Sequence, residues 1–237
     1  MLDVQNLTKR YDDTIALTDV DFTAAPGEFV AVVGPSGCGK STLLRVLAGL
    51  EPDFDGRVTV NDTPVDDGGS ADVGVVFQDP RLLPWATVRE NVRLAAPDDA
   101  SDAEIDDLLE RVGLEGFETA LPGELSGGMA QRVALARGLA YEPEALLLDE
   151  PFSALDALTK VEQQAFLLEV WHSVEATVVL VTHDVEEAAY LADRVVVLGS
   201  QPGTVVDRID VDVERPRERT DERLLDVRER ITTALGL

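Results

Sequence analysis

The sequence has a single cysteine, Cys38, and no long apolar run. One cysteine excludes an intrachain disulfide. Its place in a glycine-rich loop leaves two interpretations, a redox-sensitive thiol or an inert small side chain that fills space. The opening residues 1–4 lack the basic and then apolar segment of a secretory signal, and no apolar run approaches the ~20 residues of a membrane-spanning helix. We therefore expect a soluble, cytoplasmic chain that reaches a membrane only through a partner.

Positive charge is also scarce, because the chain has only three lysines, Lys9, Lys40 and Lys160. In all, 46 acidic residues oppose 20 Lys and Arg, a formal net charge of −26. This charge argues against nucleic acid as a partner, since binding to phosphates needs cations. The acidic residues are spread along the chain rather than gathered in a tail, which resembles proteins of salt-loving organisms. Molar salt shortens the Debye length to about 3 Å and would screen their repulsion, so we hypothesise a high-salt cytoplasm.

Hydrophobic patterning predicts an α/β fold. The 237 residues can form one large α/β domain or two small ones with a sizeable core. Residues 2–25 alternate as half-buried antiparallel strands do, and residues 61–71 are polar and glycine-rich, as in a surface loop. Residues 82–124 are predicted to be helical, with a capping box formed by Ser101 and Glu104. Apolar runs typical of buried parallel strands occupy residues 28–33, 72–77, 145–149, 177–182 and 194–198.

The segment GPSGCGKS at residues 34–41, here called the phosphate loop, fits the pattern G-x-x-x-x-G-K-S/T. A predicted apolar strand precedes the loop and a helical pattern follows it, as phosphate binding by this motif requires. This context favours a phosphate-binding loop over an ordinary glycine-rich turn between a strand and a helix. Its backbone N–H groups and the positive end of the helix dipole can hold an anion. Lys40 can reach terminal phosphates and the Ser41 hydroxyl can bind Mg²⁺. The residues expected to hold the nucleotide here are Gly34, Pro35, Ser36, Gly37, Cys38, Gly39, Lys40, Ser41 and Thr42.

The most strongly apolar of the predicted strands ends in an acidic pair, Asp149 and Glu150. A carboxylate at the carboxyl end of a strand lies at the rim where α/β proteins bind their ligands. Asp149 is placed to hold Mg²⁺ through water, and Glu150 can orient and deprotonate the attacking water. Such a pair is often only a solvated turn, but its position after a phosphate loop in the chain favours the functional role.

A second helix start that could hold an anion follows at LSGGM, residues 125–129, where Ser126 can cap the helix. This segment resembles the signature motif of ATP-binding cassette (ABC) ATPases, usually LSGGQ. The resemblance extends over nearly the whole chain. The phosphate loop resembles the Walker A loop, and residues 145–150 resemble the Walker B strand. Gln78 is at the position of the Q-loop glutamine, and residues 153–156 resemble the D-loop. His183 resembles the switch histidine, and Tyr11 resembles the aromatic residue that stacks on adenine. Taken alone, Tyr11, expected in a turn, and His183 could each be structural, but their order in the chain favours the family roles.

The resemblance implies a P-loop NTPase core with a mostly parallel sheet, an antiparallel β subdomain and an inserted α-helical subdomain. The whole chain, residues 1–237, would form one ABC ATPase domain. Its core and antiparallel subdomain would comprise residues 1–81 and 143–237, and its helical subdomain with the signature motif residues 82–142. Two copies would pack head to tail, with each ATP held between the phosphate loop of one copy and the signature motif of the other.

The resemblance also implies the site residues. The groups expected to act in hydrolysis are Glu150, His183, Gln78 and Lys40. Mg²⁺ would be held by Ser41, Gln78 and Asp149. Besides the phosphate loop and Thr42, the nucleotide would be contacted by Tyr11, Ser126, Gly127, Gly128 and Asp156. ATP and Mg²⁺ are therefore the expected ligands.

One departure from the family pattern is Met129, which stands where glutamine is usual. Because backbone N–H groups and Ser126 contact the phosphates in this family, activity should survive the change. Methionine here, together with the segment FQDPRLLPW at residues 77–85 and Asn91, resembles the nitrate, sulfonate and taurine importers. Pro80, Leu82, Leu83, Pro84 and Trp85, here called the apolar patch, could dock a transmembrane permease or pack within the chain. The permease would place the chain at the inner face of the membrane and link it indirectly to a solute-binding protein.

Three other classes of protein remain to be weighed. A soluble ABC ATPase of iron–sulfur assembly is the main alternative, whereas DNA-repair and translation-factor relatives have a long coiled-coil insertion or a second cassette that this chain lacks. A GTPase would need an Asn-Lys-x-Asp motif, which is absent. A binding module without hydrolysis is disfavoured by the presence of both Glu150 and His183. The sequence favours a small oxyanion as solute, and thiamine precursors and bicarbonate stay open.

Overall fold

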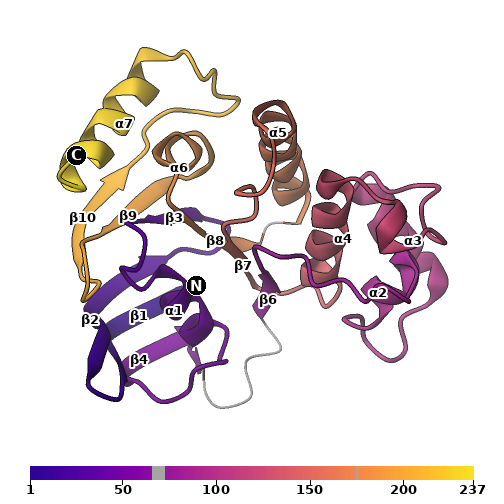
Figure 1. Ribbon diagram of the computed structural model, residues 1–237, viewed down its shortest axis with the longest axis horizontal. Helices are drawn as coiled ribbons and strands as arrows, with labels where there is room; N and C mark the ends of the chain where they lie inside the picture. Colours follow the sequence, from indigo (N-terminus) through magenta and orange to yellow (C-terminus); the bar gives the residue numbers. More distant parts are fainter. Residues whose placement is uncertain (66–72, 175) are drawn as a thin grey trace. The chain divides into compact units, whose positions relative to one another are not determined.

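The chain folds into two compact units (Figure 1). Unit 1 comprises Met1–Ser70 and Ala176–Leu237, and unit 2 comprises Ala71–Glu175. The structure, a computed structural model, describes residues 1–65, 73–174 and 176–237. Parts of the predicted loop 61–71 and of the predicted strand 72–77 therefore lie outside the described residues. The predicted helical subdomain, residues 82–142, falls entirely within unit 2.

Unit 1 contains an antiparallel sheet in the order β2-β1-β4-β5. Val4 pairs with Phe22 on one side and with Val58 on the other, and all three side chains are buried. The alternating pattern therefore places one face of this sheet in a core, as predicted. Its strands are β1 (Leu2–Tyr11), β2 (Thr14–Ala24), β4 (Asp55–Val60) and β5 (Thr63–Pro64).

Two details of this sheet correct the sequence analysis. Tyr11 is the last residue of β1 and pairs with Thr14, so it does not lie in the turn. The reason is that a two-residue turn is enough here, because Asp12 adopts a left-handed φ of 47°. The short strand β5, paired with β4, also lies within the segment predicted to be a loop.

A second group of strands in unit 1 follows the order β10-β9-β3-β8. β3 (Phe29–Val33) runs parallel to β8 (Thr177–Thr182) and to β9 (Arg194–Leu198), and β10 (Val205–Asp210) is antiparallel to β9. Every residue of β3 and β8 is buried, as expected of parallel strands covered on both faces. The helices of this unit are α1 (Lys40–Leu47), α6 (Val185–Leu191) and α7 (Glu222–Ala234).

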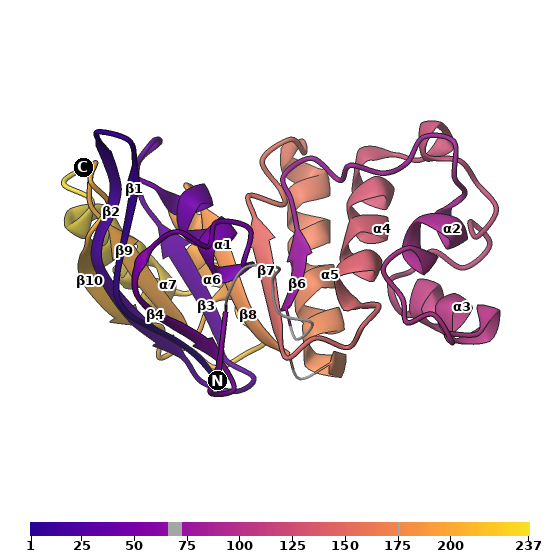
Figure 2. The ribbon, with the colours of Figure 1, turned by 90° about the horizontal axis from the view of Figure 1, so that it is seen from below.

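Unit 2 is built on two parallel strands, β6 (Val73–Val76) and β7 (Ala145–Asp149). Its helices are α2 (Val88–Arg93), α3 (Asp102–Arg111), α4 (Gly127–Leu139) and α5 (Ala157–Val174), with a short 3₁₀ helix at Pro122–Glu124. Figure 2 shows α4 between α5 and the pair α2 and α3. A buried apolar cluster, which includes Val92, Leu109 and Val133, fills the space between α2, α3 and α4.

Local signals explain where these helices begin. The Ser101 backbone N–H donates to the Glu104 carboxylate at 2.7 Å, and the Glu104 N–H donates to Ser101 Oγ at 3.2 Å. This is the capping box that the sequence predicts. Thr87 and Glu90 form a second capping box at the start of α2, which the sequence analysis did not single out. Within the described part of the chain, no helix is both long and apolar enough to cross a membrane.

Candidate functional site

The phosphate loop joins β3 to α1, and its glycines are required by its geometry. Gly37 and Gly39 have φ values of 80° and 102°, in the left-handed region that favours glycine. A Cβ atom on Gly39 would lie 2.9 Å from the Ala16 carbonyl oxygen, and one on Gly34 would lie 2.9 Å from that of Leu198. The loop can therefore fold this tightly only with glycine at these positions.

Lys40 opens α1, and its side chain turns back into the phosphate loop. Its Nζ donates to the carbonyl oxygens of Gly34 at 2.8 Å and of Pro35 at 3.2 Å. The lysine is buried, only 6% exposed. A cation is thus held by the loop that is expected to surround the phosphates of a nucleotide. The neighbouring loop residues Pro35, Ser36 and Gly37 and the helix residue Ser41 are exposed, and Thr42 is half-buried.

Cys38 lies inside the phosphate loop and is 1% exposed. Burial raises the pKa of its thiol, although the charge of Lys40 acts in the opposite direction. A thiol that stays protonated and buried is a poor nucleophile. The structure therefore favours the interpretation of Cys38 as a small side chain that fills space.

His183 and the phosphate loop follow the carboxyl ends of two neighbouring parallel strands, β8 and β3. Val33 and Thr182, the last residues of β3 and β8, pair in register, so Gly34 and His183 follow neighbouring positions. Asp184, the next residue, caps α6 by accepting hydrogen bonds from the backbone N–H groups of the first turn. The exposed His183 side chain therefore lies between a buried strand and a capped helix.

Tyr11, the predicted adenine-stacking residue, is 38% exposed at the end of β1. Lys9 Nζ lies 4.9 Å from the centroid of its ring. The same ammonium group forms an ion pair with Glu51 at 3.1 Å and donates to the Asp53 carbonyl oxygen at 2.8 Å. One face of the tyrosine ring is thus next to a fixed cation.

In unit 2 the predicted catalytic segments lie at one end of the parallel strand pair. Val76 of β6 pairs with Leu148 of β7, so Gln78 and the pair Asp149 and Glu150 follow neighbouring strand ends. Asp149 and Glu150 are half-buried, and Glu150 has an uncommon left-handed φ of 45°. The oxygen atoms of this group suit Mg²⁺, as does the exposed Ser41 hydroxyl in unit 1. Within the described residues, no cluster of three or more His, Cys, Asp or Glu could hold a metal by itself.

The signature segment forms the start of α4. Ser126 is the N-cap, and its Oγ accepts the Met129 N–H at 3.2 Å, as predicted. Ser126 and Gly127 are exposed, whereas Gly128 is buried against α5. Met129 is half-buried and packs against the apolar cluster of α2, α3 and α4. The departure from the family pattern at this position is therefore accommodated by packing.

Asp156, the predicted D-loop residue, lies at the start of α5. Its carboxylate accepts the Thr159 hydroxyl at 2.6 Å and the backbone N–H groups of Thr159 and Leu158, both at 3.1 Å. The hydrogen bond from the Thr159 side chain is the main reason why the pKa of Asp156 is lowered. This carboxylate is thus ionised at neutral pH and orients the first turn of α5.

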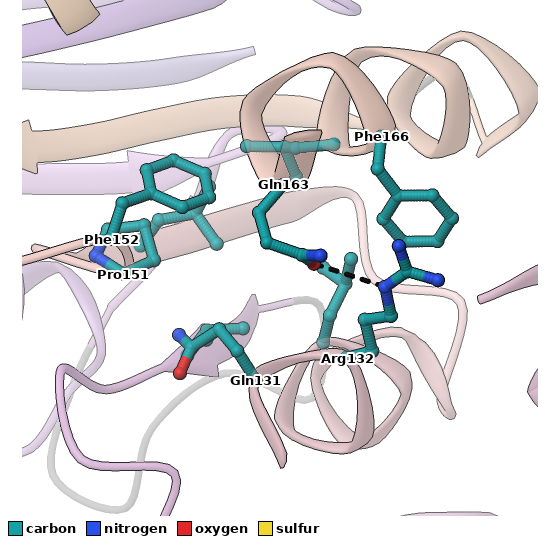
Figure 3. Close-up of a pocket in the computed structure, with 10 residues that line it drawn as sticks. Gln131, Arg132, Pro151, Phe152, Gln163 and Phe166 are labelled. Atoms are coloured by element: carbon teal, nitrogen blue, oxygen red, sulfur yellow. Dashed lines mark hydrogen bonds between the residues drawn. The ribbon is translucent and has the colours of Figure 1, made fainter. Parts of the chain in front are cut away.

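Residues of α4 and α5, together with residues at the ends of β6 and β7 and just after β7, line a small cavity of about 20 Å³ (Figure 3). Arg132 Nε donates to Gln163 Oε1 at 3.1 Å, and the guanidinium carbon lies 3.9 Å from the Phe166 ring centroid. Sequence reasoning missed these contacts, because polar residues on a helix carry no local sign of their partners. It also gave Ser153 no role of its own, although Ser153 lies in the segment that resembles the D-loop.

The fold and the order of these segments define an ATP-binding cassette ATPase. Residues 17–153 match the family described as ABC transporter. The chain is 52% identical over 235 residues to the aliphatic sulfonates import ATP-binding protein SsuB 2 of Burkholderia cenocepacia (strain HI2424), which covers 99% of this chain and 87% of that protein. A protein named SsuB 1 from Pseudomonas aeruginosa (strain UCBPP-PA14) is 50% identical over 226 residues, 92% of this chain and 90% of its own length.

The solved structures that resemble this chain are also ABC transporter cassettes. A structure titled as the dimeric structure of MJ0796, a bacterial ABC transporter cassette, has a TM-score of 0.78 and 32% identity and covers 90% of this chain and 100% of that chain. The structure of cbiO1 from Clostridium perfringens, described as part of the ABC transporter complex cbiONQ, has a TM-score of 0.79 and 31% identity over 89% of this chain and 88% of its own. The chain therefore belongs to the ABC transporter family. The predictions of the family, of the fold and of an ATPase are confirmed.

Proposed function

We propose that this chain is the ATP-hydrolysing subunit of an importer for aliphatic sulfonates. The observation that carries the proposal is the 52% identity, over 99% of the chain, to a protein named for aliphatic sulfonate import. Unlike a resemblance at single motifs, this identity extends to the parts of the chain outside the nucleotide site. A soluble ABC ATPase remains the competing hypothesis, and none of the relatives described above supports it.

Hydrolysis would require a second copy of the chain. The phosphate loop and the exposed start of α4 are both suited to bind anions, but one cassette needs only one such site for each nucleotide. A related cassette is dimeric in its solved structure, and another structure of it is titled as a post-hydrolysis dimer bound to ADP and Pi. We infer that ATP lies between the phosphate loop of one copy and Ser126, Gly127 and Gly128 of the other. The polyanion would then hold the copies together until hydrolysis.

The chemistry follows from the groups that each unit presents. Phosphoryl transfer needs positioning and charge stabilisation more than covalent help. The phosphate loop and Lys40 would bind the phosphates, Tyr11 the adenine, and His183 the terminal phosphate. Glu150 and Gln78 would orient the attacking water, and Asp156, which also holds the start of α5, would contact the nucleotide. Mg²⁺, held by Ser41, Gln78 and Asp149, would neutralise phosphate charge.

The apolar patch is a suitable docking surface for a permease. Asn91, fully buried, accepts the Leu83 N–H and donates to the carbonyl oxygens of Leu83, Ala86 and Thr87. These bonds fix the loop that carries the patch, while Trp85 stays 75% exposed. Within the patch, Leu82 packs inside the chain against the apolar cluster of α2, α3 and α4. The exposed aromatic side chain of Trp85 on a fixed loop instead favours binding to another protein. Docking would place the chain at the inner face of the membrane, and a solute-binding protein would act through the permease.

Two experiments test this proposal. The Glu150→Gln variant is expected to bind ATP, to hydrolyse it very slowly and to accumulate as a dimer, which light scattering in molar KCl would detect. A variant that stays monomeric with saturating Mg-ATP would contradict the head-to-tail dimer with ATP between its two copies. The second experiment reconstitutes the chain with a permease identified by co-purification and measures ATP hydrolysis with sulfonate, taurine or nitrate present. Failure to co-purify with any membrane protein would instead favour the soluble ATPase.

A further inference from the structure

Arg217 is almost completely buried, although arginine rarely is. Its side chain is 1% exposed. Its guanidinium group donates to five backbone carbonyl oxygens, those of Ala192 at 2.7 Å, Val213 at 2.8 Å, Tyr190 at 2.9 Å, and Ala189 and Val211 at 3.2 Å. Three of these carbonyls lie at the end of α6, and the other two precede Arg217 in the chain. Arg217, together with Arg215, which donates to the Leu191 carbonyl oxygen, therefore joins the C-terminal segment to the end of α6.

This position suits a cation. The last carbonyl groups of a helix have no partner within the helix, and its C-terminal end carries a partial negative charge. Burial lowers the pKa of Arg217 to about 10, which still leaves it protonated at neutral pH. The Asp193 carboxylate lies 4.0 Å from Arg217 and forms a closer ion pair with Arg215. It also accepts the Phe29 N–H at 2.9 Å, where β3 begins. Arg217 thus stabilises the end of α6 next to the strand that leads into the phosphate loop.

The C-terminal segment also contacts α6 at its first turn. Glu186 forms ion pairs with Arg219 at 3.8 Å and with Arg228 of α7 at 3.4 Å. The Arg219 guanidinium carbon lies 3.9 Å from the Tyr190 ring centroid. Figure 1 shows α7 beside α6. These ion pairs are partly exposed and each contributes little. The other end of α6 is held by the buried Arg217 and by Arg215, which donates to the Leu191 carbonyl oxygen and forms an ion pair with Asp193.

Helix α6 begins two residues after His183. With only seven residues it is too short to be stable alone, so its direction depends on packing and on its two caps. Asp184 caps the start and Arg217 holds the end, and any tilt of α6 moves the backbone from which the His183 side chain projects. We propose that Arg217 is a positioning residue that holds α6, and through it His183, in the orientation that hydrolysis requires. The inference rests on the proposed role of His183.

The two histidines of the chain, His172 and His183, provide a direct measurement. Histidine ring signals in an NMR spectrum report the surroundings of each ring, and the His183→Ala variant assigns them. In Arg217→Met the His183 signal is expected to shift or broaden, while the His172 signal, from α5 of unit 2, stays in place. Arg217→Lys keeps the charge but not the planar fork of donors, so an intermediate change is expected. Arg230→Gln, an exposed arginine on α7, is the matched control.

Kinetics complete the test. For Arg217→Met we expect kcat to fall about tenfold while KM for ATP stays within about twofold, the pattern of a group that acts on the transition state. A fall in kcat with an unchanged His183 signal, or wild-type values in both, would overturn the proposal. If Arg217→Met does not fold, Arg217→Lys decides by the same two measurements. If the wild-type chain hydrolyses no ATP, the proposed function fails, but the His183 signal still tests the positioning.

Discussion

The side-chain amide of Gln78 donates a hydrogen bond to Ser153 Oγ at 3.0 Å, and that hydroxyl donates to the Glu150 carbonyl oxygen at 2.9 Å. These bonds connect the segment after β6 to the segment after β7. Glu150 has a left-handed φ of 45°, which costs a residue with a side chain about 1 kcal/mol or more and needs support from its surroundings. Ser153 thus helps to hold both Glu150, the proposed general base, and Gln78.

We expect Ser153→Ala to lower kcat about fivefold with little change in KM for ATP, because the bonds from Gln78 and to Glu150 are lost together. Ser153→Thr keeps a hydroxyl and is the control, with kcat near the wild-type value. Steady-state ATP hydrolysis measures both variants. Wild-type kcat in Ser153→Ala would show that Gln78 and Glu150 are positioned without this serine.

Lys40→Ala should lose most of the affinity for nucleotide. A buried ammonium that contacts phosphates contributes about 2–5 kcal/mol, so the affinity should fall by a factor of about 30 or more. The variant also loses two hydrogen bonds within the phosphate loop, so its Tm should be slightly lower. Titration with a fluorescent ATP analogue measures the affinity, and circular dichroism verifies the fold. An unchanged Kd would remove Lys40 from its proposed role.

Cys38 should react slowly with thiol reagents. Its raised pKa means that the native thiol forms thiolate only at a higher pH than the unfolded chain does, so the alkylation rate should rise at higher pH in the native protein. At pH 7.5 we expect iodoacetamide to label native protein about 100-fold more slowly than unfolded protein. Mass spectrometry follows the single site. Rapid labelling of the native chain would revive the interpretation of Cys38 as a redox sensor.

Gly127 and Gly128 provide a matched pair of substitutions. A Cβ on Gly128 would lie 3.2 Å from Gln163 Nε2 and 3.4 Å from Thr159 Cγ2, whereas one on Gly127 would meet only Leu155 Cδ2, at 3.7 Å. Gly128→Ala should therefore lower the free energy of unfolding by about 1 kcal/mol. Gly127→Ala should leave it unchanged or slightly higher, because alanine favours the helix. Thermal unfolding of both variants in the same buffer tests the difference.

Salt should stabilise the protein. With a net charge of −26, repulsion between carboxylates opposes folding at low ionic strength, and molar KCl screens it. We expect Tm to rise steadily between 0.1 M and 2 M KCl, as measured by calorimetry. A Tm that falls over this range would contradict the proposed high-salt cytoplasm.

Local patterns predicted much of this protein. The phosphate loop, the capping box at Ser101 and the N-cap at Ser126 each depend on residues within a few positions of one another, so the sequence contains the whole signal. The buried strands were equally visible, because parallel strands covered on both faces read as continuous apolar runs. The family followed from the order of these motifs along the chain.

The sequence by itself predicted which segments would bind phosphate and identified the family to which the chain belongs, because those properties depend on short patterns and their order. Only the tertiary structure decided that Gln78 bonds to Ser153, that Met129 joins an apolar cluster and that Arg217 holds the end of α6. Gln78 and Ser153 are 75 residues apart in the sequence, and Arg217 is 25 residues from Ala192, whose carbonyl oxygen it binds. Neither position carries a local sign of its partner, because only the folded backbone brings them together.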